Sequence, residues 1–149
     1  GTVPGPITPG TFDYIIGIPT AVMPNTGTAT YSLMGYTSPT STDGTTGYGV
    51  SGNLNVNFST LVVGVNLNIA NAANSYTVND TTATTISGST FSGSLLSTTS
   101  STGSCGGACG CATSVSGFFA GANASRAGLS YTLNNGTANI QGVAAFAKQ

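Results

Sequence analysis

Charged side chains are almost absent from this chain. Of its 149 residues only 3% are charged, and glutamate, histidine and tryptophan are missing altogether. The charged residues are Asp13, Asp43, Asp80, Arg126 and Lys148. Two cations cannot neutralise a phosphate backbone or an anionic lipid surface, which excludes nucleic acid and charged membranes as partners. With a net charge of −1, copies of the chain repel each other little, which favours self-association or a tether.

The same scarcity leaves little catalytic chemistry. Acid–base catalysis needs a group that titrates near neutrality or a pair of carboxylates, and three separate aspartates supply neither. Serine and threonine hydroxyls lack a base, since the only amine is Lys148 at the end of the last expected strand. We therefore predict no enzymatic activity and no cofactor. Arg126 follows an expected bend at 121–123 and is predicted to tie it down through Asp13 or Asp80, with anion binding as the alternative.

Long apolar runs are also missing, so neither a membrane-spanning helix nor a remaining signal peptide is expected in this sequence. Hydrophobic residues still make up 39% of the chain, enough for a packed core in a domain of this length. Serine, threonine, asparagine and glycine must then cover the surface. This composition is typical of a secreted domain, and we predict an extracellular or outer cell-surface location.

Three cysteines form a tight cluster in a Gly/Ser-rich loop: Cys105, Cys109 and Cys111. In an oxidising compartment the expected state is one disulfide, between Cys105 and either Cys109 or Cys111. The third thiol is then free or bonded to another chain. A metal site is the alternative, but structural zinc needs four ligands and the chain has no histidine to complete the set.

The first 24 residues differ in character from the rest. Residues 1–10 are rich in proline and glycine, and residues 11–24 read as one extended strand that ends at a turn signal in Pro24–Gly27. We divide the chain into an arm, 1–24, and a barrel domain, 25–149. The arm is expected to expose apolar side chains that pack on a β surface, most favourably on a neighbouring copy by β-strand addition: Phe12, Tyr14, Ile15, Ile16 and Ile18.

Alternating apolar and polar residues predict a β-hairpin from Gly52–Phe58 and Leu61–Ala70. With Ser59 and Thr60 as its loop, the alternating series Leu54–Phe58 and Leu61–Ile69 place their apolar residues on one face and the asparagines on the other. The expected opposite pairs are Phe58 with Leu61, Val56 with Val63, Leu54 with Val65, and Asn53 with Asn66.

A second hairpin is expected from Leu129–Leu133 and Ala138–Ala147, with a type I′ turn at Asn135-Gly136. Further strands are expected at 75–78, 84–96 and 114–122, and no stretch has a helical period. Eight short strands in meander order predict an all-β antiparallel barrel, with a sandwich as the alternative. A transmembrane barrel is disfavoured, because aromatic girdles are missing and the outward face is rich in asparagine.

The order of several short, glycine-rich runs resembles the C-terminal eight-stranded barrel domain of transferrin-binding protein B. It is also similar to the barrels of factor H-binding protein and related bacterial surface lipoproteins. The resemblance covers about residues 23–149 and rests on the runs Met23–Tyr31, Val56–Phe58, Val63–Leu67, Ile86–Gly93, Gly117–Ala124, Ala127–Leu129 and Gly142–Gln149. It implies an exported, non-catalytic binding protein that holds a partner at the rims of its barrel.

Two functions follow from these observations. The low charge and the apolar arm favour a self-assembling structural subunit, such as a filament or surface layer, linked through the arm. The alternative, which the resemblance implies, is a surface binding module that captures a host protein or an iron carrier. The expected partners are accordingly copies of the same chain or a host or surface protein.

Overall fold

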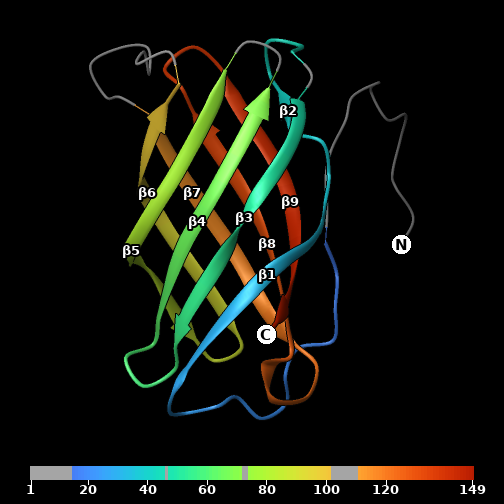
Figure 1. The fold of residues 1–149 in the computed structure, drawn as a ribbon, viewed down its shortest axis with the longest axis vertical. Coiled ribbons are helices and arrows are strands. Elements are labelled where there is room, and N and C mark those ends of the chain that lie inside the picture. The colour runs from blue at the N-terminus through green and yellow to red at the C-terminus, as the bar shows by residue number, and fades with distance from the viewer. Residues whose placement is uncertain (1–14, 46, 72–73, 102–110) are drawn as a thin grey trace, which may run out of the picture.

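The computed structural model describes residues 15–45, 47–71, 74–101 and 111–149 and consists almost entirely of β-strands (Figure 1). Each strand pairs antiparallel with its neighbours, and β1 also pairs with β9, so that the sheet closes on itself. The predicted eight-stranded antiparallel meander barrel is confirmed, with the short β2 as an addition beside β9. The strands are β1 Thr28–Tyr36, β2 Thr40–Ser41, β3 Gly47–Asn57, β4 Val62–Asn71, β5 Ser75–Ser87, β6 Thr90–Ser100, β7 Ala112–Ala120, β8 Arg126–Asn134 and β9 Asn139–Lys148.

The hairpin of β3 and β4 has the register predicted from its alternation. Val56 lies opposite Val63, Leu54 opposite Val65, and Asn53 opposite Asn66. The six predicted inward residues are all buried: Leu54, Val56, Phe58, Val63, Val65 and Leu67. Leu61 was predicted wrongly as an inward strand residue. It lies in the turn with a φ of 59° and its side chain is 49% exposed, because the turn needs a left-handed residue there.

The middle of the sheet also differs from the prediction. We expected separate strands at 75–78 and 84–96, whereas β5 runs on to Ser87, and the turn at Gly88 (φ 60°) leads into β6. The register of β5 shifts between Val78 and Thr85, and the carboxylate of Asp80 lies in that irregular stretch. It accepts hydrogen bonds from the backbone N–H groups of Thr82, Ala83 and Ser97. These bonds replace ladder pairing, which is how β5 continues through the irregularity.

The predicted type I′ turn between β8 and β9 is wrong. Gly136 has a φ of 91°, but Asn135 does not share a positive φ, as a type I′ turn requires. The side-chain oxygen of Asn135 instead accepts hydrogen bonds from the N–H groups of Thr137 and Ala138. This side-chain turn takes the place of the type I′ turn in the loop of residues 135–138.

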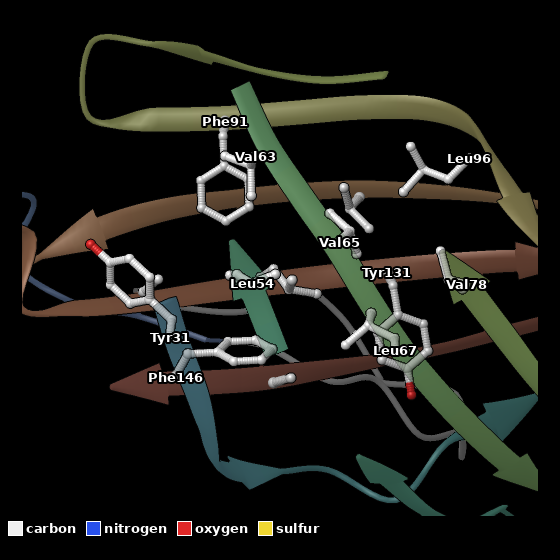
Figure 2. Packing of buried hydrophobic residues seen from close by; sticks show 14 of the residues in the cluster. Tyr31, Leu54, Val63, Val65, Leu67, Val78, Phe91, Leu96, Tyr131 and Phe146 are labelled. Atoms are coloured by element: carbon white, nitrogen blue, oxygen red, sulfur yellow. The ribbon is translucent and has the colours of Figure 1, made fainter. Parts of the chain in front are cut away.

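The inside of the barrel is filled by side chains, as Figure 2 shows for part of the core. The ring of Phe119 lies 5.8 Å from that of Tyr31, 5.9 Å from Phe58 and 5.0 Å from Phe91, measured between centroids. The Tyr31 hydroxyl donates to the carbonyl oxygen of Ala124 at 2.6 Å, and burial raises the pKa of Tyr31 to about 12. The interior is therefore a packed core.

Candidate functional site

An N-terminal segment, residues 15–22, lies on the outside of the barrel at the end of β7. Pro19 forms an isolated antiparallel bridge with Ala120, and the N–H of Thr20 donates to the carbonyl oxygen of Phe119 at 2.9 Å. The Thr20 hydroxyl donates to the carbonyl oxygen of Gly121 at 3.0 Å. This attachment uses a stretch of β7 beyond its last paired residue with β6, Phe118. The segment is thus fastened to its own barrel at Thr20.

The segment continues over two outward-facing positions of the sheet. A Cβ atom added to Gly17 would lie 2.7 Å from the ring of Phe118, and one added to Gly128 would lie 2.6 Å from Cδ1 of Ile15. Glycine is needed at residues 17 and 128, because a side chain at either residue would push the segment off the barrel. Ile15 is consequently half-buried, while Ile16 and Ile18 point into solvent with 84% and 86% of their surface exposed.

A groove lies beside this segment on the outer surface. Its floor follows the strand register: Phe118 on β7 is opposite Gly128 on β8, which is opposite Ala145 on β9. Ala145 in turn is opposite Gly35 on β1, next to the register shift that carries Met34. The groove has a volume of about 250 Å³. We call it the outer groove; its principal lining residues are Ile16, Met34, Phe118, Gly128 and Ala145, with Arg126 beside them.

A second hollow of about 480 Å³ adjoins a later part of the same segment. It is lined by residues 18–22 and by the turn at 121–123 between β7 and β8. Val22 in this hollow is 76% exposed. We use the name apolar face for the four exposed large side chains that line the two hollows: Ile16, Ile18, Val22 and Met34.

The turn beside the second hollow is conformationally strained. Asn123 and Ala124 have φ values of 53° and 56°, and two successive non-glycine residues in this region are costly. The carbonyl oxygens of the turn are held from three parts of the chain. Thr20 donates to that of Gly121, the Lys148 ammonium to that of Asn123 at 3.1 Å, and Tyr31 to that of Ala124. The turn therefore presents a fixed shape next to the apolar face.

The charges of the described residues are dispersed. Arg126 is exposed and donates to the adjacent carbonyl oxygen of Ser125 at 3.2 Å. Its predicted tie to Asp80 is not what the structure shows, because Asp80 accepts backbone N–H groups of β5 and β6, and Asp13 lies outside the described residues. Asp43 accepts hydrogen bonds from Thr45, which lower its pKa to about 2.

Some predicted site residues lie outside the described part of the chain: Phe12, Tyr14, Cys105 and Cys109. Cys111 is described and packs, partly buried, against the core just before β7. The disulfide stays a prediction, as do the arm's contact with a neighbouring copy and the division at residue 24. Within residues 15–24 the expected arm strand is reduced to the single bridge of Pro19.

Sequence reasoning found Ile15, Ile16 and Ile18 but missed the surface against which they lie. Phe118 could have indicated this surface, since it is a large apolar residue in the outward position that follows Ser114 and Ser116 on β7. Gly128 and Ala145 carried none, because small residues are common in this sequence and only the register places them in one row. Across the described ranges, no three metal-binding side chains cluster, and no helix there is long and apolar enough to cross a membrane.

Comparison with known proteins identifies similar folds but no related sequence family. No protein-family model matches the chain, and no curated protein sequence matches it. Among solved structures, a double mutant of the vaccine antigen transferrin binding protein B from Haemophilus parasuis matches with a TM-score of 0.54 and 18% identity over 85% of this chain. A single mutant of the same antigen matches with a TM-score of 0.50 and 20% identity over 88%.

Isotype 1 transferrin binding protein B from serogroup B Neisseria meningitidis matches with a TM-score of 0.51 and 19% identity over 89% of this chain. The chain covers only 26% of the first of these structures and 28% of each of the other two. It therefore spans about a quarter of the length of those structures. The predicted resemblance is confirmed at the level of fold: the chain has a closed β-barrel fold similar to that of part of transferrin binding protein B.

Proposed function

We propose that this chain is a non-enzymatic binding module of an exported bacterial surface protein and that its apolar face contacts a partner protein. The observation that carries this proposal is the gathering of exposed apolar side chains. Six large hydrophobic residues are exposed in the described part of the chain, and four of them line the two hollows beside the N-terminal segment: Ile16, Ile18, Val22 and Met34. Exposed apolar patches of this kind are typical of protein contact surfaces.

The turn at 121–125 supports the same proposal. It is held by side chains from the segment, β1 and β9, so the hollow beside it is formed before a partner arrives. A preformed surface binds at a lower entropic cost than one that must be ordered. The structural neighbours are named for binding transferrin, so an iron-carrier protein is the first partner class to test.

The test is biolayer interferometry of the immobilised chain against iron-loaded and iron-free transferrin. Ile16→Asp combined with Ile18→Asp should weaken binding at least tenfold, because the partner would have to bury two carboxylates. Asn55→Asp is the matched control, since it adds a carboxylate at an exposed site of β3. Equal loss in both variants would contradict the assignment of the face, and an absence of transferrin binding would contradict the iron carrier.

Self-assembly through the arm is the second candidate. The low charge of the chain and the exposed Ile16 and Ile18 are compatible with contact to a second copy, whereas Ile15 and Thr20 are engaged with their own barrel. Size-exclusion chromatography with light scattering separates the two functions. A monomer at high concentration supports the binding module, and assembly that disappears in the Ile16→Asp, Ile18→Asp variant supports the structural subunit.

A further inference from the structure

The outer groove combines a smooth apolar floor with one cation. Gly128 and Ala145 are adjacent in register; Ile15 covers Gly128, and the small side chain of Ala145 leaves the floor open between Ile16 and Met34. A volume of about 250 Å³ is below the range typical of sites that enclose a whole small molecule. It suits a single large apolar side chain that enters from outside.

Arg126 supplies the polar part of the groove. It lies on the same outward side of β8 as Gly128, and its guanidinium has five N–H donors, one of which is directed to the carbonyl oxygen of Ser125. The two described carboxylates are bound elsewhere, Asp43 by Thr45 and Asp80 by the backbone of β5 and β6. Arg126 is therefore positioned to receive a carboxylate from a partner, in a geometry that a guanidinium favours.

We propose that the outer groove recognises a segment of the partner protein in which a large apolar side chain is followed directly by aspartate or glutamate. The apolar side chain packs on Ala145 beside Ile15, and the carboxylate pairs with Arg126. Charge complementarity selects this partner, because Arg126 is the only titratable residue among the described residues that line the groove. This inference deepens the proposed function and rests on it.

The test uses the full chain and four synthetic peptides with blocked ends, followed by chemical shifts of the backbone amides. The first peptide contains Leu-Glu between Gly-Ser and Ser-Gly, and the matched peptides contain Leu-Gln, Ala-Glu and Leu-Lys. Leu-Glu should shift the amides of Gly128 and Ala145 and bind about two- to fivefold more tightly than Leu-Gln, the range measured for an exposed ion pair. Added salt should reduce this preference.

Two variants sharpen the test. Arg126→Gln should remove the preference for Leu-Glu over Leu-Gln and keep the preference for Leu-Glu over Ala-Glu. Ala145→Leu should fill the groove and abolish binding of every peptide, and its unchanged circular dichroism spectrum should show that the barrel is intact. Equal binding of Leu-Glu and Leu-Lys would overturn the proposal, and so would Leu-Glu binding that survives in Ala145→Leu.

Dodecanoate forms a further arm of the experiment, because a fatty acid also joins an apolar chain to a carboxylate. If dodecanoate shifts the groove amides and Leu-Glu does not, the occupant is a lipid and the proposal is wrong. The proposed function is judged separately, by the Ile16→Asp, Ile18→Asp variant. If that variant loses its protein partner while no peptide discriminates, the binding module stands and the acidic motif falls.

Discussion

The outer surfaces of two parts of this barrel are built on opposite plans. On β3 and β4 the outward face carries a row of asparagines, which bond to one another and to a neighbouring threonine: Asn66 donates to Asn53 at 3.2 Å, and Thr30 donates to Asn55 at 3.2 Å. On β7, β8 and β9 the outward row is Phe118, Gly128 and Ala145, partly covered by the N-terminal segment. One surface satisfies its own polar groups, whereas the other leaves apolar area for contact.

This difference shows how a protein with few charges separates solubility from binding. Amide side chains that pair across strands keep the β3–β4 surface hydrated and give an approaching apolar group nothing to bury. The β7–β9 surface attracts apolar groups, but its own segment covers part of it and limits the exposed patch. The contrast depends on which residues of each strand face inward. It is tested by placing a charge at an inward or an outward position, and by displacing the N-terminal segment from the β7–β9 surface.

The largest effect is expected for Val56→Asp on the β3–β4 hairpin. Val56 is 1% exposed, so the variant places an unpaired charge in the core and should lose on the order of 4 kcal/mol of unfolding free energy. Asn55 is the neighbouring residue and faces outward, so Asn55→Asp should change the unfolding free energy by less than about 0.5 kcal/mol. Urea unfolding followed by circular dichroism checks both. A destabilised Asn55→Asp beside a stable Val56→Asp would mean that the register is slipped by one residue.

An intermediate effect is expected for Gly128→Ala on the β7–β9 surface. The added Cβ would press on Ile15 and should displace the segment at a cost of about 1 kcal/mol, while the barrel stays closed. The amide of Thr20, bonded to Phe119, should then exchange its hydrogen faster. Gly35→Ala is the control, because no atom lies within 4 Å of its added Cβ. Unchanged exchange at Thr20 in Gly128→Ala would show that Ile15 does not hold the segment.

The smallest effect concerns pH. The backbone N–H group of Ala83, with those of Thr82 and Ser97, lowers the pKa of Asp80 against the opposing effect of burial. The folded pKa is below the unfolded one, so this stabilisation is complete above the unfolded value and is lost as the pH falls through the folded value. The difference in unfolding free energy between Asp80→Asn and the unchanged protein should therefore become smaller below about pH 4. A difference that stays constant down to pH 2 would contradict this.

Local patterns in the sequence were sufficient to predict the strand register where apolar and polar residues alternate regularly. The β3–β4 register followed from the phase of Leu54, Val56, Val63 and Val65, because a slip by one residue would expose all four. Leu61 and Asn135 were misjudged, since the backbone conformation of a turn depends on side-chain hydrogen bonds and left-handed residues that alternation does not encode. The continuous β5 was missed because Asp80 bridges an irregularity that resembles a strand end.

The sequence by itself determined the class of the fold, the inside and outside of its strands, and the shortage of catalytic groups, since each depends on composition or on a period of two. The tertiary structure alone decided where a partner has room. Phe118, Gly128 and Ala145 are separated by several residues along the chain and become one row only through the pairing of β7, β8 and β9. Ile15 and Thr20 then join that row from the other end of the chain, because the register leaves the end of β7 uncovered and glycine leaves space for the approach.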